Sequence, residues 1–117
     1  MRAVARTPEE LETLLEDAFV LRSGEALTAL FEDGAVLVTN GGAREARGGD
    51  EIARLACEMW EHGRTYLAGR TRVLQAREMG LIVAEAGISV VRRGGDLGWR
   101  YAIALLSDDD ASTEEDK

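Results

Sequence analysis

The stretch between residues 25 and 49 constrains the fold most, because its pattern changes from helix to strand and then reverses. The apolar residues between 27 and 31 keep the spacing of one helical face. Residues 35–38 then form a short, valine-rich apolar run, which favours a strand. An Asn-Gly-Gly sequence follows at 40–42, and these residue types tolerate the positive φ that a tight reversal requires. The pattern predicts a short helix that leads directly into a strand pair.

Two longer helices are predicted, one on each side of this stretch. Thr7 is a suitable cap for the first, Pro8 fits its first position, and the apolar face continues to about Arg22. The next helix begins with Asp50 as its expected cap and ends at His62.

Strand patterns dominate after residue 64. Three long antiparallel strands are predicted over residues 65–78, 81–92 and 97–106, with hairpin turns at 79–80 and 93–96. In the last strand, alternation places four large apolar residues on one face: Trp99, Tyr101, Ile103 and Leu105. Segregated helices and strands indicate an α+β fold, with three N-terminal helices packed on one face of a curved antiparallel sheet.

Composition limits the class of protein. A chain of 117 residues with 45% hydrophobic and 31% charged residues is typical of a globular domain. We expect one domain over residues 1–107 and an acidic, disordered tail over 108–117. The net charge of −8 argues against nucleic acid as a partner. The apolar runs are too short for a membrane span or a signal peptide, so a cytoplasmic location is expected. One cysteine and one histidine provide no nitrogen–sulfur metal site, and we expect no cofactor.

The order of these elements resembles the nuclear transport factor 2-like superfamily, in particular its SnoaL-like group. Three passages carry the resemblance: the helix-to-strand segment at 29–36, the entry to the third helix at 47–52, and the final strand from Gly98 to Ser107. The resemblance implies a cone-shaped sheet that closes on a helix, as in the cystatin-like α+β roll and in polyketide cyclases and ketosteroid isomerases. It also implies an internal pocket and a homodimer formed through the sheet.

The resemblance does not extend to the isomerase site. Alignment on Leu30-Phe31 and Asp33 puts Thr39 where ketosteroid isomerases have their catalytic carboxylate. Threonine cannot abstract a proton next to a carbonyl at neutral pH. The first-helix tyrosine of those isomerases falls near Asp17, so steroid isomerisation is disfavoured.

Two carboxylates are the candidate catalytic residues. Glu85 stands in an otherwise apolar strand, where a dry pocket could make it a general acid or base. The alternative is that it points to solvent or pairs with an arginine of a neighbouring strand, such as Arg70 or Arg72. Asp17 stands at the edge of the first helix's apolar face, where it could be a polar anchor or a solvated boundary residue.

Four aromatic residues are the candidate ligand-binding residues: Trp60, Tyr66, Trp99 and Tyr101. They could line a pocket for a flat apolar ligand, with the tyrosine hydroxyls as hydrogen-bond donors. The alternative is packing in the core or in a dimer interface. This alternative is stronger for the tryptophans, because a tyrosine inside a cone usually needs a partner for its hydroxyl.

Two functions therefore stay open, and the residues do not decide whether the chain is an enzyme. The first is binding of a small apolar molecule, polyketide- or steroid-like, in the cone, with acid–base isomerase, cyclase or hydrolase chemistry. The second is a non-catalytic dimeric interaction or regulatory module with a filled pocket. The enzymatic hypothesis requires at least two convergent polar groups deep in the pocket.

Overall fold

The computed structural model describes residues 4–107 of the chain. The predicted acidic tail, 108–117, lies outside these residues. The elements in chain order are α1 (Pro8–Leu21), α2 (Gly24–Thr28), β1 (Phe31–Thr39), the short 3-10 helix η1 (Asn40–Gly42), β2 (Arg44–Arg47), α3 (Gly48–Glu61), β3 (Thr71–Ala76), β4 (Met79–Ala84), β5 (Gly87–Arg93) and β6 (Trp99–Leu106).

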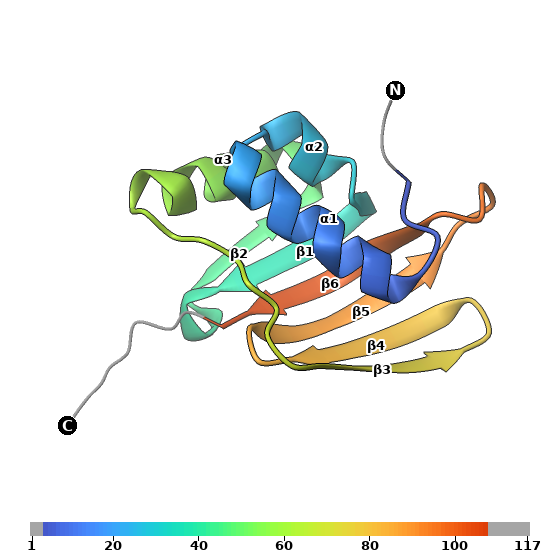
Figure 1. Ribbon diagram of the computed structural model, residues 1–117. Coiled ribbons are helices and arrows are strands. Elements are labelled where there is room, and N and C mark those ends of the chain that lie inside the picture. Colours follow the sequence, from blue (N-terminus) through green and yellow to red (C-terminus); the bar gives the residue numbers. More distant parts are fainter. Residues whose placement is uncertain (1–3, 108–117) are drawn as a thin grey trace.

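Six strands form one curved sheet in the order β2-β1-β6-β5-β4-β3. All neighbouring strands are antiparallel except β1 and β6, which run parallel. The three α-helices lie on one face of this sheet (Figure 1). The predicted α+β architecture is confirmed. Among the described residues, no helix combines the length and apolar character needed to cross a lipid bilayer.

The helix starts follow the sequence in one case and depart from it in another. Thr7 caps α1 as predicted, since its Oγ1 accepts a hydrogen bond from the backbone N of Glu10 at 3.0 Å. The predicted cap of α3, Asp50, is wrong, because α3 already begins at Gly48. Instead, the carboxylate of Glu51 accepts from the backbone N of Arg47 at 2.9 Å.

Two of the three strands predicted after residue 64 have wrong boundaries, whereas the third, 97–106, is observed as β6 and ends at the predicted residue. The expected strand at 81–92 is two strands, β4 and β5, joined by a two-residue turn at 85–86. The expected turn at 79–80 lies inside β4. The chain turns at 77–78 instead, where Arg77 adopts a positive φ of 57°. Residues 65–70 precede β3 as an irregular segment.

A β-bulge inverts the predicted facing of the last strand. Val90 and Val91 are adjacent on β5, but their partners on β6 are Ile103 and Tyr101, so Ala102 is an extra residue. Before the bulge, Trp99 and Tyr101 share one face, as predicted, and both are buried in the core. After it, Ile103 and Leu105 lie on the outer face, with 42% and 44% of their surface exposed. One extra residue therefore gives β6 two different apolar faces.

The core lies between the helices and the inner face of the sheet. Its fully buried side chains come from both layers: Leu11 and Leu15 of α1, Leu27 of α2, Ile52 of α3, Leu37 of β1, Ile82 of β4, Val91 of β5 and Tyr101 of β6. Burial of apolar side chains from every layer is the main term that holds the helices on the sheet.

Candidate functional site

A glutamate of α1 is buried inside the molecule. Glu12 is only 4% exposed, and both of its carboxylate oxygens accept hydrogen bonds from tyrosines. The hydroxyl of Tyr66 donates to Oε1 at 2.5 Å, and the hydroxyl of Tyr101 donates to Oε2. We call Glu12, Tyr66 and Tyr101 the interior cluster.

The interior cluster contains no positive charge. Within residues 4–107, Glu12 forms no salt bridge, and its two described hydrogen bonds come from uncharged phenols. Burial of a carboxylate costs several kcal/mol unless hydrogen bonds compensate, on the order of the penalty measured for buried ions. The two tyrosines provide this compensation. An apolar residue at position 12 would avoid the cost, so the cluster is not explained by stability.

The environment keeps both phenols protonated. Burial raises the pKa of Tyr66 above its usual range, and its hydrogen bond to Glu12 adds to the effect. Burial also raises the pKa of Tyr101, with a further contribution from the nearby charge of Glu12. A phenolate beside a carboxylate would place two negative charges together in a dry site.

Tyr66 belongs to an irregular segment that crosses the face of the sheet. We call residues 63–70 the strap; it leads from the end of α3 to the start of β3 (Figure 1). The strap is bound to α1 a second time, since the backbone N of Ala68 donates to Glu16 Oε2 at 2.9 Å. It also joins the β4–β5 turn, where the backbone N of Ala86 donates to the carbonyl of Ala68 at 3.2 Å. Two glutamates one helical turn apart thus hold the strap against α1.

Aromatic rings surround the interior cluster. The ring centroid of Phe19 lies 5.9 Å from that of Tyr66 and 5.8 Å from that of Trp60. The Phe19–Trp60 contact is edge-to-face. Phe31 lies 5.2 Å from Tyr101. The indole N–H of Trp60 is buried and has no hydrogen-bond partner within the described chain. The tyrosines of the interior cluster are therefore packed against other aromatic rings.

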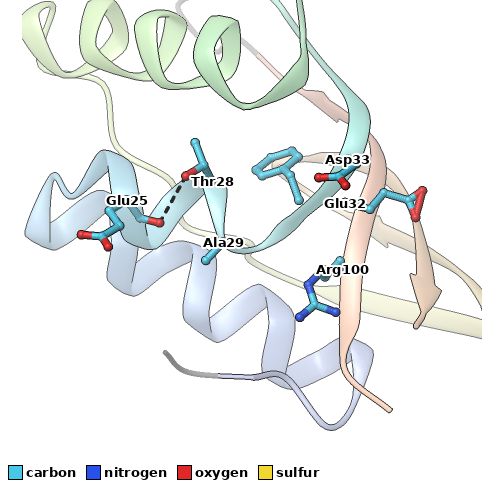
Figure 2. Close-up of a pocket in the computed structure, with 7 residues that line it drawn as sticks. Glu25, Thr28, Ala29, Glu32, Asp33 and Arg100 are labelled. Carbon is cyan, nitrogen blue, oxygen red and sulfur yellow. Dashed lines mark hydrogen bonds between the residues drawn. The ribbon is translucent and has the colours of Figure 1, made fainter. Parts of the chain in front are cut away.

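A cavity of about 390 Å³ lies apart from the interior cluster, between α2, β1 and β6. Glu25 and Thr28 of α2, Glu32 and Asp33 of β1, and Arg100 of β6 line it (Figure 2). Two of its charged residues pair with residues outside the lining: Arg100 donates two hydrogen bonds of 3.0 and 2.8 Å to Asp96, and Glu32 pairs with Arg92 at 3.2 Å. Phe31 also lines this cavity, but no tyrosine does, so its carboxylates have no phenol donor like those of the interior cluster.

Comparison with solved structures gives the fold a wider context. A cystatin-like protein of unknown function from Nostoc punctiforme superposes with a TM-score of 0.74 and 16% identity, over 88% of this chain and 89% of the other. A nuclear transport factor 2-like protein with a cystatin-like fold from Novosphingobium aromaticivorans has a TM-score of 0.69 and 17% identity, over 89% and 80%. A ketosteroid isomerase-like protein from Erwinia carotovora atroseptica has a TM-score of 0.70 and 18% identity, over 87% and 93%. This chain has the cystatin-like fold of nuclear transport factor 2-like proteins. No protein-family model matches the sequence, and no curated protein matches it.

Within this cystatin-like fold, the two predicted catalytic carboxylates lie apart from the interior cluster. The Glu85 side chain is 63% exposed, and its Oε2 accepts from the backbone N of Arg70 at 3.2 Å. The Arg70 guanidinium lies 3.8 Å away, which is the arginine pairing named as the alternative. Asp17 is exposed on α1. The structure does not bring either residue near the tyrosines, and a catalytic role for them stays a prediction.

The four predicted ligand-binding aromatics are all buried, but in different surroundings. Tyr66 and Tyr101 converge on one carboxylate, which provides the expected partner for their hydroxyls. Trp60 packs on Phe19. Trp99 lies elsewhere, with its backbone N bonded to the carbonyl of Ala5 at 2.9 Å and its ring 5.9 Å from the guanidinium of Arg93. The tryptophans therefore sit in the core, as their alternative interpretation described.

Sequence reasoning missed Glu12, although a signal was present. Glu12 is three residues before Leu15 and seven before Phe19, so it falls on the buried stripe of α1. Asp17 is one residue before Ala18 but lies on the exposed side, with Val20 and Leu21 at 75% and 71% exposure. A carboxylate within an otherwise apolar helical stripe was the observation that could have identified the site.

Proposed function

We propose that this chain binds a small apolar molecule between its helices and its sheet, and that Glu12 acts on it as a general acid or base. The observation that supports the proposal is the burial of a carboxylate whose only described hydrogen-bond donors are two phenols. Carboxylates held in apolar surroundings by precise hydrogen bonds are typical of acid–base sites. The isomerase-like description of the Erwinia protein, whose fold is similar, agrees with proton transfer as the class of reaction.

The strap gives the ligand a way to reach Glu12. Tyr66 is on the strap, whereas Tyr101 is on the central strand β6. Outward movement of the strap would free Glu12 Oε1 and leave Tyr101 bonded to Oε2. Glu12 would then accept a proton from a carbon next to a ligand carbonyl and return it to the same or a neighbouring carbon. A phenol hydroxyl, kept protonated, would donate to the carbonyl oxygen as negative charge develops there.

Deuterium exchange tests this function without knowledge of the natural substrate. The probe is 2-tetralone, a flat apolar ketone, and NMR measures the loss of protons next to its carbonyl in D₂O. We expect the wild-type protein to accelerate exchange and Glu12→Gln to reduce the protein-dependent rate by about 100-fold or more, the usual contribution of a general base. Asp17→Asn and Glu85→Gln are matched controls that also test the two earlier candidates. Exchange that Glu12→Gln leaves unchanged would contradict the proposal.

A second candidate function is a non-catalytic dimeric module, and the outer face of the sheet favours it. Cross-strand partners make two apolar rows there, one of Val38, Leu105, Ile88 and Val83, the other of Val36, Ile103, Val90, Leu81 and Leu74. Five of these side chains are between 38% and 48% exposed. A continuous apolar surface of this kind is typical of an interface between proteins. We propose that a second copy of the chain covers it, a proposal that is compatible with the first function and that mass measurement in solution tests.

A further inference from the structure

A second, smaller cavity lies at the C-terminal end of α3, apart from the interior cluster. It has a volume of about 210 Å³ and is bounded by α3, by the end of β1, by the start of β2 and by the start of the strap. Leu55 and Met59 of α3 form its apolar wall. Its volume is below the roughly 300 Å³ at which pockets for drug-sized ligands begin, so it suits a small molecule.

Thr39 gives this cavity an unused polar group. Its side chain lines the cavity and is only 6% exposed, yet its hydroxyl has no hydrogen bond among the residues that the structure describes. Thr39 Oγ1 is not among the fully buried polar atoms without a partner in the described chain, so the hydroxyl is accessible from the cavity, where a ligand or water can bind it. The hydroxyl can both donate and accept. Thr39 therefore marks the place where a polar atom of a ligand would sit.

A guanidinium group neighbours Thr39 across the two strands. Arg44 is the direct cross-strand partner of Thr39, so both side chains lie on one face of the β1–β2 ribbon. Arg44 Nη2 pairs with Glu58 Oε1 at 2.6 Å, and this is its described ion pair. A guanidinium has five N–H donors, so the pair with Glu58 leaves donors for another acceptor. Arg64 also lines the cavity, but it has an interaction of its own, so the site depends on Arg44.

His62 has one ring nitrogen with a defined role. Its Nδ1 lies 2.8 Å from the carbonyl oxygen of Glu58. Because a carbonyl can only accept, Nδ1 carries the proton, and in the neutral ring the other nitrogen, Nε2, is an acceptor. The cavity thus combines a hydroxyl, a guanidinium and an imidazole with a wall of leucine and methionine.

We propose that this cavity binds a small organic carboxylate with a short apolar chain. Arginine matches a carboxylate in geometry and charge, and the Thr39 hydroxyl adds a hydrogen bond from the floor of the site. Leu55 and Met59 would contact the apolar chain of the ligand. This inference does not depend on the proposed role of Glu12, which lies outside the cavity.

An NMR titration with butyrate tests the proposal, with butyramide as the uncharged ligand of the same shape. We expect butyrate to shift the amide signals of Thr39, Arg44 and Met59, and butyramide to bind at least about tenfold more weakly. Thr39→Val keeps the β-branched shape and removes only the hydroxyl; Arg44→Gln removes the charge. Each should weaken butyrate binding by about tenfold.

Arg72→Gln is the matched control, because it removes an exposed arginine from the opposite edge strand β3. Its affinity for butyrate should equal that of the wild type. Equal binding of butyrate and butyramide would overturn the proposal. So would Thr39→Val and Arg44→Gln variants that both bind butyrate as the wild type does, or signal shifts confined to other parts of the chain.

Discussion

The hydroxyl of Tyr66 donates a 2.5 Å hydrogen bond to Oε1 of Glu12, and this bond ties the strap to the first helix. The other carboxylate oxygen is bound by Tyr101 of β6, so a single glutamate connects helix, strap and central strand. Hydrogen bonds to a buried charge are stronger than those between neutral groups. The stability of the molecule should therefore respond to changes at these three positions more than at other polar groups.

Alkaline titration should show the tyrosines to be protected. The chain has two tyrosines, Tyr66 and Tyr101, and the pKa of each is raised in the folded protein. Above about pH 10 the unfolded chain releases both protons while the folded chain keeps them. The stabilisation that comes from the two raised pKa values is therefore fully present below about pH 10. Above that pH, the free energy of unfolding falls by about 2.7 kcal/mol per pH unit. Absorbance at 295 nm and circular dichroism should change together; phenolate that forms near pH 10 in a folded chain would contradict this.

The coupling between Tyr101 and Glu12 should appear in a double-mutant cycle. Tyr101→Phe leaves one oxygen of a buried carboxylate without a donor, which should cost about 2–3 kcal/mol of unfolding free energy. In a Glu12→Met background the carboxylate is gone, and the same substitution should cost less than about 1 kcal/mol. Urea unfolding of the four proteins measures the coupling. If Tyr101→Phe lowers the free energy of unfolding equally in both backgrounds, Tyr101 and Glu12 are not energetically coupled.

The backbone amides of the strap should be the least protected from hydrogen exchange in the interior of the molecule. Glu16→Ala removes the acceptor of the Ala68 backbone N–H and leaves Glu12 unchanged. We expect faster hydrogen exchange at residues 66–70, by about tenfold, with little change in the exchange of β5 and β6. Thr13→Ala on the exposed side of α1 is the control. If Glu16→Ala accelerates exchange throughout the sheet, the strap does not open on its own.

Much of the fold could be predicted from the sequence, because local signals were strong. Thr7 and Pro8 marked the start of α1, and the valine run with Asn-Gly-Gly marked β1 and its reversal. The predicted strand boundaries were wrong where the local residues do not indicate a turn. Arg77-Glu78 and Glu85-Ala86 are turns without glycine or proline at their centres, set by pairing across the sheet.

The candidate site was only half predictable. The buried tyrosines needed a partner, and this need was visible in the sequence. The partner depended on which face of α1 turns inward and on how an irregular strap crosses the sheet, and both are tertiary facts. The bulge at Ala102 shows the same limit, since a single extra residue reversed the facing of Ile103 and Leu105.

A charge on the outer face of the sheet should separate the proposed dimer. Ile103 is 42% exposed in the middle of an apolar row, so Ile103→Glu would bury a carboxylate in the interface. Light scattering should give twice the chain mass of 12.7 kDa for the wild type and the chain mass for the variant. Val20→Glu, on the helix layer, is the control and should stay dimeric. A wild-type protein that is monomeric at about 100 μM would exclude this interface as a stable one.

Alanine substitution should destabilise the protein at Gly87, where two backbones lie close together, and not at Gly49, where there is open space. A Cβ atom on Gly87 would lie 2.1 Å from the carbonyl oxygen of Leu105, which is backbone of β6 and cannot rotate away. Gly87→Ala should therefore cost about 3 kcal/mol or more and lower the Tm by about 12 °C. Gly49 in the first turn of α3 has no atom within 4 Å of such a Cβ, so Gly49→Ala should be neutral or stabilising by up to about 1 kcal/mol. Thermal unfolding of both variants measures the difference. Similar Tm values for the two variants would contradict this prediction. They would mean that β5 and β6 can move apart at Gly87, which pairs with Leu106 at the end of β6.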